Sequence, residues 1–133
     1  MDYESKNHSK HLLIVHLIFV CKYRKKLLLK MGDTVKRMVM EIADEQDFSV
    51  LEMEVDKDHI HLLIQYNPAQ SILGMVRLLK QLITYRLWRE SDCLELLSKN
   101  FWKEKTFWSD GYFACSIGNV SKDAITKYIR SQG

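Results

Sequence analysis

The first half of the chain alternates between extended and helical patterns of hydrophobic residues. Residues 12–21 are apolar on both faces except at His16, which predicts a central strand or one whose second face is covered. Residues 34–46 carry apolar side chains at helical spacing, and Asp33 is a suitable N-cap for that helix. Residues 49–56 then alternate as a strand does. The alternation predicts Leu51, Met53 and Val55 on one face, and Val50, Glu52 and Glu54 on the other.

The second half of the chain repeats this order of elements. Residues 59–66 are predicted to form a strand, and residues 71–90 the longest helix, which has a wide apolar arc. Residues 107–117 are predicted to be extended and aromatic-rich, broken by an Asp-Gly turn or bulge. Ser121 is expected to cap a short last helix over residues 122–132.

The order β-α-β-β-α-β-α defines an expected fold class. Its first six elements match the α+β, ferredoxin-like split βαβ arrangement, in which both main helices cover one face of a four-stranded sheet. The other face is left for a ligand, a partner or the last helix. We therefore predict a single domain over residues 1–133, with residues 1–10 flexible and the last helix within residues 121–133.

Composition narrows the class of protein only slightly. A length of 133 residues suits one domain with a real core, and 47% hydrophobic residues is ordinary for a globular chain. A net charge of +3 permits a nucleic-acid partner without requiring one. The three cysteines, Cys21, Cys93 and Cys115, are widely spaced and are expected to be reduced thiols. No signal peptide or membrane-spanning run is evident, so we expect a soluble, cytoplasmic protein with no membrane partner.

The pair His59 and His61 is the first candidate for chemistry. One residue separates them on a predicted strand, so both side chains leave the same face, ~7 Å apart along the strand. Ile60, on the opposite face, belongs to the expected core. Two imidazoles in this arrangement can converge on one divalent ion, although two histidines on a solvated face fit the pattern equally well.

The second candidate is the pair Tyr128 and Gln132 in the last predicted helix. They lie four residues apart and therefore on one helix face. A helical tyrosine usually packs, and a terminal glutamine is usually solvated. Spacing alone does not choose Tyr128 among the six tyrosines, nor does it connect this helix to the histidines.

Four short segments follow one another along the chain: His16-Leu-Ile-Phe-Val-Cys-Lys-Tyr-Arg24, Asp58-His-Ile-His-Leu-Leu-Ile64, Trp108-Ser-Asp-Gly-Tyr-Phe113 and Tyr128-Ile-Arg-Ser-Gln132. In this order they resemble the TnpA-type single-tyrosine HUH transposases of small bacterial and archaeal insertion sequences, which act on single-stranded DNA. The resemblance covers nearly the whole chain, from about residue 11 to residue 132. Each segment is short, and it is their order and spacing that make the resemblance specific.

The resemblance implies roles for individual residues. His59 and His61 match the HUH pair and would bind Mg²⁺ or Mn²⁺, with Gln132 completing the metal site. Tyr128 matches the nucleophile that forms a 5′-phosphotyrosine with DNA. The family also implies a homodimer in which the tyrosine helix of one subunit completes the histidine site of the other, acting on the hairpin ends of a mobile element in the nucleoid.

The expected DNA contacts come from basic and aromatic residues. Arginine and lysine side chains bind phosphates, and exposed aromatic rings stack on unpaired bases, although a solvated turn or core packing explains the same residues. One departure bears on how a hairpin is held: the long helix carries Gln81-Leu82-Ile83 where relatives often have glycine and small hydroxyl residues. Candidate phosphate ligands are Lys22, Arg24, Lys25, Lys26, Arg77 and Lys80, and candidate stacking residues are Tyr23, Trp108 and Tyr112.

Two alternative functions remain open from the sequence. One is a domesticated relative that nicks hairpins by the same chemistry. The other is a non-catalytic ferredoxin-like module that binds single-stranded nucleic acid, for which aromatic rings rather than histidines would be expected on the open sheet face.

Overall fold

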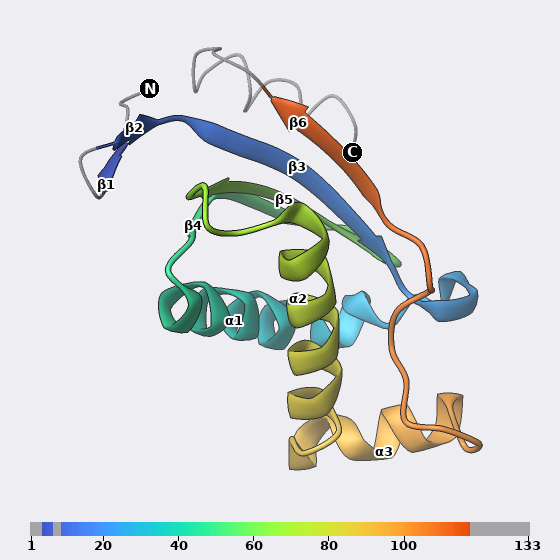
Figure 1. Cartoon of the computed structure of the whole chain (residues 1–133). Coiled ribbons are helices and arrows are strands. Elements are labelled where there is room, and N and C mark those ends of the chain that lie inside the picture. The colour runs from blue at the N-terminus through green and yellow to red at the C-terminus, as the bar shows by residue number, and fades with distance from the viewer. Residues whose placement is uncertain (1–3, 7–8, 118–133) are drawn as a thin grey trace.

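The computed structural model describes residues 4–6 and 9–117 and has a four-stranded sheet with helices beneath it (Figure 1). The strands of this sheet are β3 (Leu13–Val20), β4 (Ser49–Val55), β5 (His59–Tyr66) and β6 (Phe113–Ile117). They lie in the order β4-β5-β3-β6, and every neighbouring pair is antiparallel.

The helices α1 (Leu28–Gln46) and α2 (Ile72–Leu87) lie on the same side of the sheet (Figure 1). Each links two strands that are not neighbours, because β5 lies between β3 and β4, and β3 lies between β5 and β6. This is the split βαβ arrangement. The predicted α+β, ferredoxin-like class is confirmed.

Four elements were not predicted. A two-stranded sheet pairs β1 (Glu4–Lys6) with β2 (Ser9–His11), and a 3₁₀ turn, η1 (Lys22–Arg24), follows β3. Helix α3 (Ser91–Asn100) follows α2 and buries only Cys93 and Leu97, four residues apart. Two buried positions in a polar stretch are too weak a pattern to predict a helix.

Helix α1 begins at Leu28, six residues before the predicted start. Asp33 therefore lies inside the helix, and the N-cap prediction was wrong. Leu28 and Met31 are buried and extend the apolar stripe toward the N-terminus. The first turns of α1 were not predicted because Gly32 lies in them, and glycine normally disfavours a helix. Here it permits close approach to β4: a Cβ at this position would lie 3.1 Å from Val55 Cγ1.

Strand β4 contains a register irregularity between Val50 and Glu52 that corrects its predicted faces. An extra residue in one strand reverses the alternation around it. Val50 therefore packs with Met53 and Val55 against the main core, whereas Leu51 packs against Ile14 and Leu63 on the other side of the sheet.

Helix α2 begins as predicted, because the Ser71 hydroxyl caps it by accepting a hydrogen bond from the Gly74 backbone N–H at 2.9 Å. It ends at Leu87 rather than at Glu90. Strand β6 begins at Phe113, later than predicted, and before it only Trp108 forms an isolated bridge, to Cys21. In the described part of the chain, no helix is long and apolar enough to cross a membrane.

Candidate functional site

Strand register places three histidines on one face of the sheet. On β5, His59 and His61 are opposite Val20 and Ile18 of β3, and in an antiparallel pair opposite residues share a face. His16 lies two residues before Ile18, so it shares that face too. We call this side the histidine face and the opposite side, which α1 and α2 cover, the helix face. The predicted common orientation of His59 and His61 is thus seen in the structure.

His16 is the residue that sequence reasoning missed. Its Nε2 lies 3.2 Å from Nδ1 of His61, and the two rings are nearly parallel, with centroids 5.5 Å apart. Both side chains are buried, His16 being 0% exposed and His61 3% exposed. The only sign in the sequence is a polar residue inside a strand that is apolar on both faces. Assigning it to the site required knowing that β3 pairs with β5.

His59 has a different partner and is more exposed, at 21% of its side chain. Its Nδ1 lies 2.8 Å from Asp58 Oδ1. Arg24 Nε donates to the other oxygen of the same carboxylate at 3.1 Å. His59 and Arg24 together lower the pKa of Asp58, chiefly through the histidine hydrogen bond. Asp58 therefore stays ionised and can only accept from His59.

His59 and His61 lie side by side on the histidine face. The rings of His59 and His61 have centroids 4.9 Å apart at an interplanar angle of 69°. Nε2 of His61 is buried and has no hydrogen-bond partner among the described residues. A buried ring nitrogen without a partner is costly unless a ligand satisfies it. The pair therefore fits a divalent cation.

Burial favours the neutral form of His16 and His61, which is the form in which an imidazole can bind a metal. It lowers the pKa of His16 to about 4, with a smaller contribution from neighbouring His61. Burial likewise lowers the pKa of His61, assisted by His59. Both rings are neutral at pH 7, as ligation requires. Within residues 4–6 and 9–117, however, no three His, Cys, Asp or Glu side chains form a group able to hold a metal. A cation bound by His59 and His61 would therefore need further ligands.

Two predicted site residues, Tyr128 and Gln132, lie outside the described residues. The structure therefore places His59 and His61 but leaves the tyrosine, the glutamine and the predicted last helix without a position.

The basic run after β3 adopts an unusual backbone. Tyr23 and Arg24 have φ values of 60° and 53°, in the left-handed region that disfavours residues with a Cβ. Tyr23 is 73% exposed. Lys22 forms an ion pair with Glu104 at 2.9 Å, and Lys25 donates to Asn100 at 3.3 Å. The run thus combines an exposed ring with cations that are already tied to neighbouring elements.

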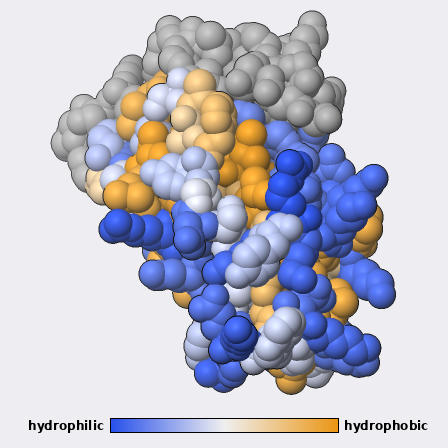
Figure 2. Space-filling model, turned by 90° about the vertical axis from the view of Figure 1, so that its right-hand side faces the viewer, coloured by the Kyte–Doolittle hydropathy of each residue, from blue (hydrophilic) through white to orange (hydrophobic). Residues whose placement is uncertain are grey.

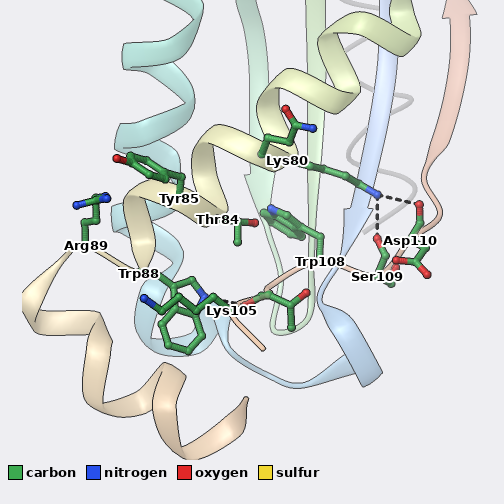
Figure 3. Close-up of a pocket in the computed structure, with 11 residues that line it drawn as sticks. Lys80, Thr84, Tyr85, Trp88, Arg89, Lys105, Trp108, Ser109 and Asp110 are labelled. Carbon is green, nitrogen blue, oxygen red and sulfur yellow. Dashed lines mark hydrogen bonds between the residues drawn. The ribbon is translucent and has the colours of Figure 1, made fainter. Parts of the chain in front are cut away.

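The two predicted phosphate ligands on α2 differ in environment. Arg77 is exposed, whereas the Lys80 ammonium donates to the backbone carbonyls of Ser109, Asp110 and Gly111 at 2.7–3.2 Å. Burial lowers the pKa of Lys80. In Figure 3 its side chain points along the rim of a groove toward Ser109 and Asp110. Lys80 therefore anchors the chain that leads into β6.

This groove lies between α2 and residues 105–110 and has a volume of about 650 Å³. Tyr85, Trp88 and Arg89 line its far end, where the Arg89 guanidinium lies 4.3 Å from the Tyr85 ring centroid (Figure 3). The groove contains none of the three histidines of the histidine face. Of the two other stacking candidates, Tyr112 is half-exposed, whereas Trp108 is buried.

The chain is similar to known proteins over most of its length. Residues 9–132 match the family described as "Transposase IS200 like". The chain belongs to this family. It is 31% identical over 118 residues to the ISDra2 transposase TnpA of Deinococcus radiodurans, which covers 88% of this chain and 81% of that protein. It is also 26% identical over 133 residues to the IS200 transposase of Salmonella typhimurium, covering 98% and 84% of the two chains.

Solved structures agree with this membership in the IS200-like family. A candidate transposase from Deinococcus radiodurans R1 superposes with a TM-score of 0.75 at 25% identity, covering 97% of each chain. A REP-associated tyrosine transposase bound to a REP hairpin shares the fold with a TM-score of 0.60 at 14% identity, covering 96% of this chain and 68% of that one. The resemblance inferred from the four sequence segments is confirmed.

Proposed function

We propose that this IS200-like transposase cleaves and rejoins single-stranded DNA through a 5′-phosphotyrosine at Tyr128, with Mg²⁺ or Mn²⁺ held by His59, His61 and Gln132. One observation carries the metal part of the proposal. His61 presents a buried, neutral Nε2 without a partner among the described residues, beside a second imidazole on the same face.

The chemistry follows from these groups. A phenol has an ordinary pKa near 10; the phenol of Tyr128 gives its proton to solvent as its oxygen attacks the phosphorus, so a new P–O bond forms while the bond to the 3′ oxygen breaks. That oxygen takes up a proton and leaves as a 3′-hydroxyl. When bound, the cation would stabilise negative charge on the phosphate oxygens. Because the intermediate remains a phosphodiester, attack by another 3′-hydroxyl rejoins DNA without ATP.

The proposed DNA partner is the hairpin end of a mobile element, and the proposed assembly is a homodimer with shared sites. Charge supports the DNA partner: Arg24 links the basic run to His59 through Asp58, so a phosphate bound by this run lies beside the histidine face. Arg77 and Lys26 are exposed and available to phosphates. Lys22, Lys25 and Lys80 would have to exchange existing partners to do the same.

The test is incubation with single-stranded DNA carrying the element ends and Mn²⁺. We expect a protein–DNA adduct stable to detergent, lost in Tyr128→Phe and lost with a chelator, but kept in Tyr85→Phe, which removes an exposed hydroxyl elsewhere. An adduct that survives Tyr128→Phe refutes the nucleophile. No adduct with any end sequence, together with tight DNA binding, supports the non-catalytic module instead.

The shared site has its own test. A His59→Ala subunit and a Tyr128→Phe subunit are each expected to be inactive alone. Mixed into heterodimers, they should recover part of the cleavage activity, because one of the two sites then has both an intact histidine pair and an intact tyrosine. Heterodimers that cut no DNA would argue for sites built within one subunit.

A further inference from the structure

A neutral imidazole carries one proton, so the contact between His16 and His61 has two possible forms. If His16 Nε2 donates, the neutral His61 ring keeps its proton on Nε2, and that nitrogen cannot bind a cation. If His61 Nδ1 donates, its Nε2 carries a lone pair, and His16 keeps its proton on Nδ1. The direction of this single hydrogen bond therefore decides whether His61 is a ligand.

We infer that His16 is a positioning residue of the metal site: its Nε2 accepts the Nδ1–H of His61 and so presents the Nε2 lone pair of His61 to the cation. The inference rests on the proposed function for the identity of the cation. It assigns no direct metal contact to His16, whose Nε2 already faces the far side of the His61 ring at 3.2 Å.

The neighbouring histidine supports this direction. The Asp58 carboxylate lies 2.8 Å from Nδ1 of His59, so Nδ1 donates to it and Nε2 is the nitrogen of His59 left to face a cation, with the Asp56 carboxylate 4.0 Å from it. Metal-binding histidines commonly donate the other ring N–H to such an acceptor, which fixes both tautomer and ring orientation. With His16 as the acceptor for His61, both HUH histidines present Nε2 in the same way.

The surroundings of His16 hold its ring in place. It lies opposite Leu63 on β5 and Cys115 on β6, and the edge of the Phe113 ring contacts it with centroids 5.7 Å apart. A strand in the middle of the sheet leaves little freedom for its backbone, so the acceptor is fixed before any ligand binds. A neutral acceptor also adds no negative charge beside an anionic phosphate, in contrast to the carboxylate that serves His59.

The test compares the wild-type chain with His16→Phe, which keeps a ring but no acceptor, and His16→Gln, whose amide oxygen can replace Nε2. We expect the Mn²⁺ dissociation constant, measured without DNA by electron paramagnetic resonance, to rise about 10- to 100-fold in His16→Phe and to recover most of that loss in His16→Gln. Ile14→Val, a mild change on the same face, should bind Mn²⁺ as the wild type does. Equal Mn²⁺ affinity in His16→Phe and wild type would refute the inference.

Long-range ¹H–¹⁵N spectra of the metal-free wild-type chain give a second readout that does not depend on the folding of any variant. We expect His61 to be protonated on Nδ1 and His16 on Nδ1, and a His61 ring protonated on Nε2 would overturn the inference. A wild-type chain that binds no Mn²⁺ refutes the cation of the proposed function and, with it, the purpose of the pairing. Intact Mn²⁺ binding that ignores His16→Phe refutes the role of His16 alone.

Discussion

The two faces of the sheet share the same four strands but differ in how their buried polar atoms are satisfied. On the helix face, β3 and β5 contribute an unbroken apolar set, including Leu17, Phe19 and Leu62, packed under α1 and α2. On the histidine face, the same two strands bury His16, His61 and Gln65. Nε2 of His61 and Nε2 of Gln65 have no hydrogen-bond partner among the described residues, and in the main core the same holds for Nε1 of Trp108.

A buried donor or acceptor without a partner costs about 1–3 kcal/mol, so the histidine face is not arranged for stability alone. Local rules of good packing are broken chiefly where a site is built. On the side of the molecule seen in Figure 2, the sheet end is rich in hydrophobic side chains, whereas the opposite end is mostly hydrophilic. The helix face thus carries most of the apolar core, whereas the unsatisfied polar atoms of the histidine face support the ligand site proposed above.

The largest expected effect comes from comparing Leu62→Ala with Leu63→Ala. These neighbours on β5 are both fully buried but point to opposite faces. Leu62→Ala should lower the free energy of unfolding by about 2–5 kcal/mol, because it leaves a cavity in the main core. Leu63 packs in a small cluster with Ile14, and its truncation should cost less. Urea denaturation of both variants measures the difference, and equal losses would mean that the two faces are packed alike.

Acid should affect the histidine face next. The pKa of His16 is about 4 in the folded chain and near 6.5 in the unfolded one, so between these values the unfolded chain binds more protons. The contribution of His16 to the free energy of unfolding is therefore complete above pH 6.5, and it falls by up to about 3 kcal/mol as the pH drops toward 4. His16→Gln should remove much of this dependence in urea titrations at pH 7 and pH 5. An unchanged pH dependence in that variant would place the titrating group elsewhere.

Lys80 should matter more to stability than Arg77, although both are basic residues on α2. Lys80→Met removes a charged donor from three carbonyls and should cost about 1–3 kcal/mol. Arg77→Met, at an exposed position, should change stability by less than about 0.5 kcal/mol. Thermal unfolding distinguishes them, and similar melting temperatures for the two variants would remove the anchoring role of Lys80. A loss of DNA affinity confined to Arg77→Met would match the contacts proposed above.

The smallest effect is a difference in thiol reactivity. Cys115 is opposite His16 on the histidine face and is partly exposed, whereas Cys21 is buried. Burial raises the pKa of Cys21 to about 12, which suppresses its thiolate. A thiol reagent should therefore modify Cys115 in the folded chain and Cys21 only after unfolding, as mass spectrometry would show. Modification of Cys21 first would mean that the bridge between Cys21 and Trp108 opens readily.

Much of this fold could be predicted from the sequence because each strand and helix has its own period. Strand β5 matched its predicted bounds, and parity alone gave the common orientation of His59 and His61. Errors arose where tertiary contacts overrode the local pattern. Gly32 argues locally against a helix, but its lack of a side chain lets α1 pass close to Val55. In β4, one extra residue exchanged the faces of Val50 and Leu51.

The candidate site could be predicted only in part, for a similar reason. His59 and Asp58 are adjacent in the chain, so their hydrogen bond is local. His16 lies 45 residues from His61, and only the register between β3 and β5 brings them together. No spacing rule reaches across that distance. The link to Tyr128 and Gln132 came from family resemblance and stays a prediction.

Strand β3 lies inside the sheet, with its even-numbered positions on the histidine face and its odd-numbered positions on the helix face. The two sets of positions are therefore under different constraints. Substitutions at His16 or Ile18 would act on the histidine face, whereas the neighbours Leu17 and Phe19 lie in the core on the other face. An insertion or deletion of one residue would instead exchange the two sets along the rest of the strand. Sequence changes in β3 can therefore alter one face of the sheet at a time only if the length of the strand is kept.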